Sequence, residues 1–254
     1  KAKVLWRKAS AIESSSLAAN LCLIRHALLE GQADKALELI TGLNDKQSKQ
    51  ALIIKLWAQA LADAGRWQEL KDKLPTWKKA LGPDYDIMMQ QASKGNFAEI
   101  ASKEGGGKLI ESWLASPRSV RKDPGQQAAY IQQLINQGMH SDAEQALVEH
   151  QRTAPEPLLI PLFKQIKLPN PSAGLKKLEG WLKNDENNVE LLSTLGHLAY
   201  NANDLILAEK ALSKAIKLGN RQQDLRLLAS LKESQQDNLQ ALALFKQSMA
   251  QPGQ

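Results

Sequence analysis

The glycine-rich stretch KEGGGKLIESWLA has the residue types that come nearest to a phosphate-binding loop in this sequence. In such a loop, G-x-x-x-x-G-K-[ST], backbone N–H groups surround the phosphates, the lysine reaches the terminal ones and the hydroxyl holds magnesium. If Gly107 and Lys108 are the GK pair, the first glycine should stand at Ser102 and the hydroxyl at Leu109. Both residues are wrong for the motif. We therefore interpret the three glycines as a flexible connection between two helices.

Four histidines could coordinate a metal or act as a base: His26, His140, His150 and His197. None pairs with another at i, i+3 or i, i+4, the spacing that would put two imidazoles on one helical face. We interpret the first three as packing residues. By the repeat described below, His197 shares a face with Ser193 and Asn201, where it could contact a ligand such as haem. No Ser-His-Asp or Cys-His set is visible from the spacing, so we predict neither catalysis nor a metal site.

The sharpest charge cluster is SPRSVRKDP, which contains Arg118, Arg121 and Lys122. It could bind an acidic partner or lipid headgroups, and the formal net charge of +6 is compatible with either. The alternative is a solvated loop before a helix that begins at Pro124. Aromatic side chains that would stack on bases are missing beside these cations, so nucleic acid is not a predicted partner.

The composition of the 254 residues favours helices, because leucine and alanine dominate and aromatic residues make up only 5%. The single cysteine, Cys22, excludes an internal disulfide and is interpreted as a small buried core residue. No apolar run approaches the roughly 20 residues of a membrane-spanning helix. The opening KAKVLWRKAS has no initiating Met and resembles the interior of a helix. We expect the chain to be a piece of a longer protein.

A pattern of about 34 residues recurs along the chain. In five places a small or apolar residue is predicted to open the second helix of a pair: Ala36, Leu70, Ala143, Ala208 and Ala241. Five residues before each of these anchors stands a predicted turn residue: Gly31, Gly65, Gly138, Asn203 and Gln236. This pattern resembles the tetratricopeptide repeat, in which two antiparallel helices are joined by a turn that favours glycine.

We predict an all-α fold, a right-handed α-solenoid of tetratricopeptide-like helix pairs. Residues 1–104 and 126–254 are expected to form two sub-stacks, and residues 105–125, rich in Gly, Pro and basic side chains, a connection between them. Between 158 and 184 several prolines should keep the helices short. Repeat alignment predicts a polar groove on the first helices, suited to an extended or helical peptide. Its predicted residues, with the basic cluster, are Lys55, Gln59, Gln132, Asn136, Ser193, His197, Asn201 and Arg226.

Four stretches carry a more specific resemblance. They are GRWQELKDKLPTWKKA, a segment from Leu109 to Leu147 that contains W…PRSVRKDP, the run from Leu158 to Ile216, and the repeat from Leu227 to Met249. In this order they resemble the HemY family, tetratricopeptide inner-membrane proteins encoded beside haem-pathway genes in many proteobacteria. The residues that correspond to the family's most recognisable motif are Trp113, Pro117, Arg118, Arg121, Asp123 and Pro124.

The resemblance implies an N-terminal membrane anchor of two hydrophobic helices outside this sequence, with this domain on the cytoplasmic side of the bacterial inner membrane. It further implies a non-catalytic scaffold that binds protein partners, among them enzymes of late haem synthesis. Two alternatives stay open: a haem or porphyrin carrier or sensor, and a generic peptide-binding tetratricopeptide adaptor. The same name is used elsewhere for a flavin-dependent oxidase, but this chain has no G-x-G-x-x-G fingerprint to support that activity.

Overall fold

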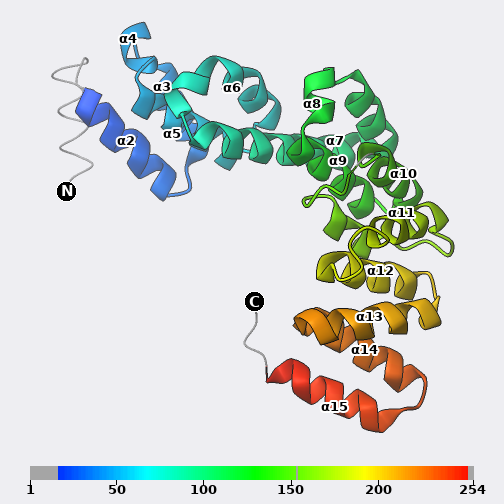
Figure 1. Ribbon diagram of the computed structural model, residues 1–254. Coiled ribbons are helices and arrows are strands. Elements are labelled where there is room, and N and C mark those ends of the chain that lie inside the picture. Colours follow the sequence, from blue (N-terminus) through cyan, green and yellow to red (C-terminus); the bar gives the residue numbers. More distant parts are fainter. Residues whose placement is uncertain (1–16, 153, 251–254) are drawn as a thin grey trace. The chain divides into compact units, whose positions relative to one another are not determined.

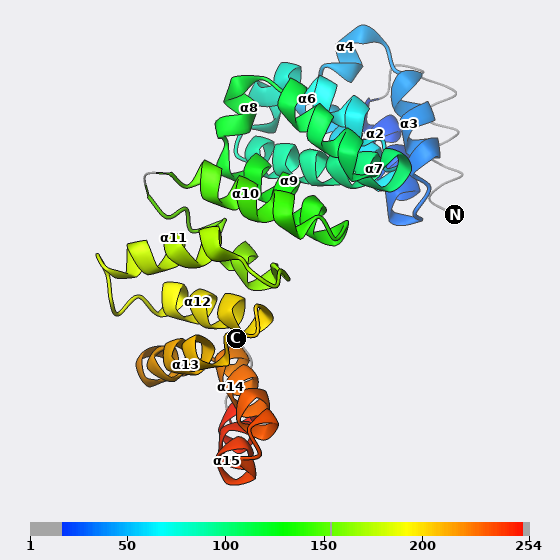
Figure 2. The ribbon, with the colours of Figure 1, turned by 90° about the vertical axis from the view of Figure 1, so that its right-hand side faces the viewer.

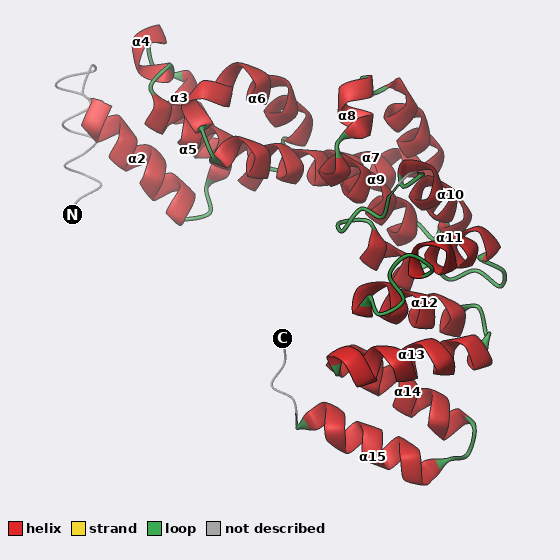
Figure 3. Ribbon diagram, in the orientation of Figure 1, coloured by secondary structure: helices red, strands yellow, loops and turns green. Residues whose placement is uncertain are grey.

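The computed structural model describes residues 17–152 and 154–250, and these residues form helices and turns without a strand among them (Figure 3). The prediction of an all-α fold is confirmed to this extent. The opening segment KAKVLWRKAS, expected to lie within a helix, is outside the described residues. Among the helices that the structure describes, we find none whose length and apolar character would let it cross a bilayer.

The chain divides into two compact units between Lys103 and Glu104. From residue 17 on, where the description begins, the first unit contains these helices (Figure 1): α2 (Leu17–Leu29), α3 (Ala33–Thr41), α4 (Asp45–Ser48), α5 (Ala51–Asp63), α6 (Trp67–Leu81) and the first part of α7 (Asp84–Ala115). The second unit holds the rest of α7 and the following elements: α8 (Arg118–Lys122), α9 (Pro124–Asn136), α10 (His140–His150), the 3-10 helix η1 (Ile160–Gln165), α11 (Ser172–Leu182), α12 (Val189–Asn201), α13 (Leu205–Gly219), α14 (Gln222–Ser234) and α15 (Asn238–Met249).

The same tight turn joins five pairs of these helices. Its central residue has a left-handed backbone with φ between 62° and 74° at each predicted position: Gly31, Gly65, Gly138, Asn203 and Gln236. The next residue donates its N–H to a carbonyl five positions earlier, as Gln32 does to Ala27 (2.8 Å) and Asp237 to Lys232 (2.9 Å). This is the hydrogen bond of a Schellman cap, which satisfies a carbonyl at the helix end. The predicted turns are confirmed at all five places.

The anchor residues that follow these turns are buried, which also agrees with the repeat. Ala36, Leu70, Ala143 and Ala208 are 0% exposed, and Ala241 is 4% exposed. Small side chains here let the two helices of a pair approach closely. A Cβ added at Gly196 would lie 2.6 Å from Leu212 Cγ, so the crossing of α12 and α13 requires glycine as well.

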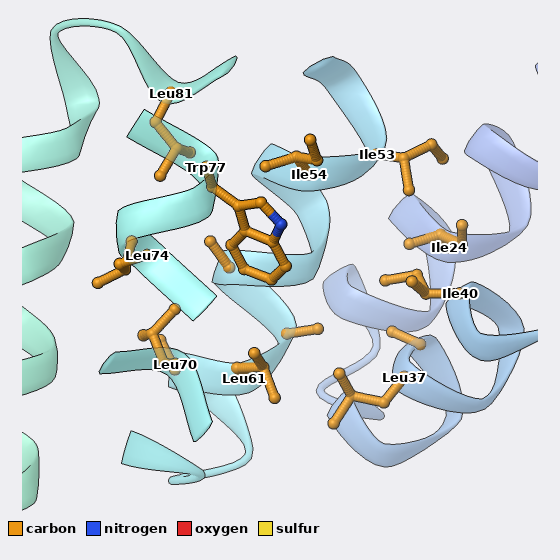
Figure 4. Close-up of a cluster of buried hydrophobic side chains, with 14 of the residues drawn as sticks. Ile24, Leu37, Ile40, Ile53, Ile54, Leu61, Leu70, Leu74, Trp77 and Leu81 are labelled. Carbon is orange, nitrogen blue, oxygen red and sulfur yellow. The ribbon is translucent and has the colours of Figure 1, made fainter. Parts of the chain in front are cut away.

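An apolar cluster holds the first unit together (Figure 4). Ile24 of α2, Ile40 of α3, Ile53 and Leu61 of α5, and Leu74 of α6 are each at most 1% exposed. These side chains come from four helices, and each helix packs on the next along the chain. Removing so much apolar surface from water is the main stabilising contribution to this unit. Cys22 of α2, interpreted from the sequence as buried, is only half-buried.

Successive helices of the second unit also pack on their neighbours, from α9 and α10 through η1 and α11 to α15. Figure 2 places α11 to α15 in this order. In addition, the first helices of neighbouring pairs touch one another: α9 contacts η1, η1 contacts α12, and α12 contacts α14. In the proline-containing segment between 158 and 184 the elements are short, as expected, with η1 covering six residues and α11 eleven.

The stretch Gly105 to Gly107, interpreted from the sequence as a flexible connection, is mostly helical in the structure. Only Gly105 leaves the helical conformation (φ 84°, ψ 173°), and it breaks α7 into two helices. Gly106 and Gly107 are helical, and a Cβ on Gly106 would lie 1.9 Å from Met139 Sδ, so that glycine serves close packing. Most of the expected connection 105–125 is therefore helical, formed by the second part of α7 and by α8.

Candidate functional site

Polar side chains of the second unit form a continuous line across four successive first helices, which we call the polar seam. It consists of Gln132 on α9, Lys164 and Gln165 on η1, Glu190, Ser193, His197 and Asn201 on α12, and Arg221 and Asp224 at the start of α14. The four α12 residues lie three or four positions apart and so share one helical face. Each one contacts a neighbouring element, as described next.

Asp224 is the centre of the seam, with a side chain that is only 1% exposed. Ser193 Oγ donates to Asp224 Oδ1 at 2.6 Å, and His197 Nε2 lies 3.0 Å from the same oxygen. Because a carboxylate only accepts, Nε2 must carry the proton. Burial opposes ionisation of Asp224, but the hydrogen bonds from His197 and Ser193 outweigh it, and the pKa of the carboxyl is lowered.

Serine, histidine and aspartate are the residues of a hydrolytic triad, but their order here is different. In a triad the histidine lies between the serine and the aspartate, so that it can take the serine proton. Here the carboxylate of Asp224 lies between Ser193 and His197. Ser193 is also 0% exposed, which leaves a substrate no access to its hydroxyl. The arrangement joins α12 to α14 and does not activate a nucleophile.

Glu190 joins three elements of the seam. Lys164 Nζ lies 3.0 Å from Glu190 Oε1, and Arg221 Nη1 binds Glu190 Oε2. Burial raises the pKa of Glu190, but hydrogen bonds and charges from Lys164 and Arg221 exceed that effect and lower it. The Glu190 carboxylate therefore connects η1, α12 and α14 as a charged bridge.

The remaining seam residues bind the 3-10 helix. Asn201 Nδ2 donates to the carbonyl oxygens of Lys164 and Ile166, each at 2.9 Å. Gln132 and Gln165 exchange hydrogen bonds of 2.9 and 3.1 Å. Asn201 thus satisfies carbonyls at the end of η1 that have no partner within so short a helix.

The predicted groove face is thus corrected at α12. Ser193, His197 and Asn201 do share one face, but it faces the neighbouring helices, with Ser193 buried and the His197 side chain 18% exposed. The sequence analysis missed Asp224 as their partner. Its position 31 residues after Ser193, close to one repeat, is the signal that could have found it.

The other predicted groove residues are more accessible. Lys55 Nζ forms an ion pair of 2.7 Å with Asp84, in which both side chains are about half exposed. Gln59 donates to Asp63 at 2.7 Å, and Gln132 donates to Asn136 at 3.1 Å. Arg226 is exposed on α14. These side chains offer polar contacts to a partner, but the described contacts do not gather them into one cluster.

The basic cluster forms the short helix α8. Arg118 and Lys122 are exposed, whereas Arg121 is half-buried and its Nε donates to the Ser116 carbonyl at 3.1 Å. Gln127 Nε2 donates to the Arg121 carbonyl at 2.7 Å, which fixes α8 on α9. Two of the three predicted cations are therefore available to a partner, and Arg121 has a structural contact.

No protein-family model matches the chain. The chain is similar to proteins named Protein HemY from Escherichia coli strain K12, Escherichia coli O157:H7 and Shigella flexneri. Each alignment covers 217 residues at 25% identity, which is 84% of this chain and 54% of the relative. The chain thus spans about half the length of the curated relatives that it matches. The similarity agrees in direction with the resemblance seen in the motifs.

The W…PRSVRKDP motif behind that resemblance has a structural core. The Trp113 ring stacks on Tyr130 (centroids 4.5 Å apart, planes at 7°) and meets the edge of His150 at 5.7 Å. Asp123 Oδ1 accepts from the Gln126 N–H at 2.8 Å and caps α9. These residues shape the junction that presents α8.

This aromatic cluster perturbs two titrating groups. Burial, with smaller contributions from Asp142 and Glu149, raises the pKa of Tyr130 to about 12. Burial also lowers the pKa of His150; Glu149 opposes this shift and Arg121 adds to it. His150 is therefore a packing residue against Trp113, as the sequence interpretation had it, and its lowered pKa favours the neutral imidazole. The described residues contain no group of three or more His, Cys, Asp or Glu placed to hold a metal ion.

Proposed function

We propose that this chain is a right-handed α-solenoid of tetratricopeptide-like helix pairs that serves as a non-catalytic scaffold for other proteins. The observation that carries the proposal is the turn repeated at Gly31, Gly65, Gly138, Asn203 and Gln236, each followed by a buried anchor five residues later. A helix pair of this kind cannot bury its apolar stripe alone, so neighbouring pairs stack and leave an extended surface for partners.

The polar seam supports a rigid scaffold in the second unit. Its hydrogen bonds and ion pairs connect residues 26 to 37 positions apart, about one repeat, for example Lys164 with Glu190 and Asn201 with Lys164. A surface that is already ordered loses less conformational entropy when a partner binds. Arg118 and Lys122 on α8 are the cations that we propose to contact an acidic protein surface.

The proposed pathway rests on similarity. Because most of the chain aligns with proteins named HemY, we propose that its partners are enzymes of late haem synthesis. We also propose that a segment outside this sequence anchors it to the bacterial inner membrane, with this domain on the cytoplasmic side. The chain spans about half the length of those relatives.

Affinity capture from detergent-solubilised bacterial membranes tests the scaffold. The wild-type domain is compared with Arg118→Glu/Lys122→Glu and with a matched reversal of two exposed lysines on and just after α11, Lys176→Glu/Lys183→Glu. We expect haem-pathway enzymes on the wild-type and α11-reversal baits and their loss from the α8 variant. Equal retention by all three would remove α8 as the contact, and retention by none would remove the haem pathway.

Haem or porphyrin binding at His197 is the weaker alternative. Its Nε2 already binds buried Asp224, so an iron bond to that nitrogen would leave the carboxylate without one of its two hydrogen-bond donors. We expect no Soret shift that depends on His197 when haem is added. A shift that disappears in His197→Ala but persists in His140→Ala would restore this alternative.

A further inference from the structure

A groove of about 720 Å³ in the first unit lies outside every site described above. It runs between the start of α5 and the second half of α6, next to the end of α4, and its lining includes Ile54, Trp57, Trp77, Lys49, Lys73 and Lys79. A volume of this size is within the range of about 300–1,000 Å³ typical of sites for small molecules.

Two indole rings form the apolar floor of the groove. The ring centroids of Trp57 and Trp77 are 5.2 Å apart, with their planes inclined at 46°. Trp77 is 8% exposed and points from α6 toward Ile54 of α5, as Figure 4 shows. Trp57 is half-buried, so part of its ring is accessible from the groove. Together they offer a flat conjugated molecule a surface on which to stack.

Three lysines surround this floor. Lys73 Nζ lies 4.6 Å from the Trp57 ring centroid and 5.8 Å from that of Trp77, which places its charge directly over the indoles. Its nearest carboxylate, Glu69, is 3.9 Å away and also binds Arg66 at 2.5 Å. Lys49 and Lys79 are exposed at the margin. Among the described residues that line the groove there is no aspartate or glutamate, so their field favours an anion.

We propose that this tryptophan–lysine groove binds a small organic anion with a flat apolar body and a carboxylate. The body would lie against Trp57 and Trp77, and the carboxylate would approach the ammonium groups of Lys49 and Lys79. The indole surface supplies affinity for any flat apolar ligand, whereas the lysines supply selectivity for the anion. This site is independent of the scaffold function, which we assign to α8 in the other unit.

Three matched probes test the proposal: pyrenebutyrate, the neutral pyrenebutanol and the cationic pyrenebutylamine. Energy transfer from tryptophan to pyrene reports binding. We expect the wild-type protein to bind the butyrate about tenfold more tightly than the alcohol and to bind the amine most weakly, because charges near a surface contribute on this order. The preference should decrease as salt is added, because ions screen these exposed lysines.

Variants locate the effect. Lys49→Gln/Lys79→Gln should abolish the preference for the butyrate while leaving the affinity for the alcohol unchanged. The control variant is Lys46→Gln/Lys78→Gln. It removes two exposed lysines that are close in sequence to Lys49 and Lys79 but do not line the groove, and it should preserve the preference for the butyrate. Trp57→Leu should lower the affinity for all three probes. Equal affinities for the three probes, or a preference unaffected by the groove lysines, would overturn the proposal. So would tight binding of an acidic, tryptophan-containing peptide together with no binding of the butyrate.

Discussion

The two units of this protein join neighbouring helices with different chemistry. In the first unit, apolar side chains such as Ile40, Leu61 and Leu74 meet from four helices and are almost completely excluded from water. In the second, the contact between first helices also contains the polar seam. There Asp224 accepts hydrogen bonds from α12, and Glu190 forms an ion pair with Lys164 of η1. Apolar contacts are non-directional and allow substitution by similar volumes, whereas the seam specifies which atoms must meet.

The largest expected effect is in the apolar unit. Leu74 is 0% exposed, so Leu74→Ala removes buried methyl groups and leaves a cavity. We expect a loss of about 2–5 kcal/mol in the free energy of unfolding, measured by urea denaturation. Leu29→Ala is the control, because Leu29 is 87% exposed and its truncation should change stability by less than about 0.5 kcal/mol. Equal effects of the two variants would contradict the assigned core.

A smaller loss is expected in the seam. Asp224→Ala leaves Ser193 and His197 without their shared acceptor and should cost about 1–3 kcal/mol. Asp63→Ala, which removes an exposed carboxylate that accepts from Gln59, should have little effect. Hydrogen exchange should place the Asp224→Ala loss in α12 and α14. Loss of protection spread evenly over the first unit as well would mean that the seam does not act locally.

Lowering the pH should destabilise the second unit before the first. The folded-state pKa values of Asp224 and Glu190 lie below their unfolded values of about 3.9 and 4.3. Their contribution to stability is therefore complete above these unfolded values and is lost as the pH falls through the folded ones. We expect the second unit to lose protection first on acidification, after correction for intrinsic exchange rates. Glu190→Gln/Asp224→Asn should flatten this dependence; an unchanged slope would exclude these two carboxylates as its cause.

The smallest predicted effects compare the turns of the two units. Gly65 and Gln236 occupy the same left-handed position with φ 67° and 65°. A side chain strains this conformation, so Gly65→Ala should destabilise the protein by about 1–2 kcal/mol and Gln236→Gly should stabilise it by up to about 1 kcal/mol. Thermal denaturation measures both. If Gln236→Gly is destabilising, the glutamine side chain makes a contact that offsets the strain.

Much of the fold could be predicted from local patterns. A turn needs a residue that tolerates positive φ, and the following helix needs a small or apolar anchor, so both leave a signal at fixed spacing, as at Gly138 and Ala143. The glycine stretch shows the limit of this reasoning. Gly105 to Gly107 have one residue type, yet only the first breaks the helix, because Gly106 is required by the proximity of Met139.

The candidate sites, too, could be predicted from the sequence only in part. The sequence by itself determined the helical repeat, the turn positions and the basic cluster around Arg118, because these depend on residue type and short-range spacing. Only the tertiary structure decided that Ser193 and His197 bind Asp224 and that Trp57 and Trp77 form one groove with Lys73. Each site combines side chains of two helices, α12 with α14 and α5 with α6. Whether they meet depends on the rotation and crossing of those helices, which are fixed by packing over the whole unit.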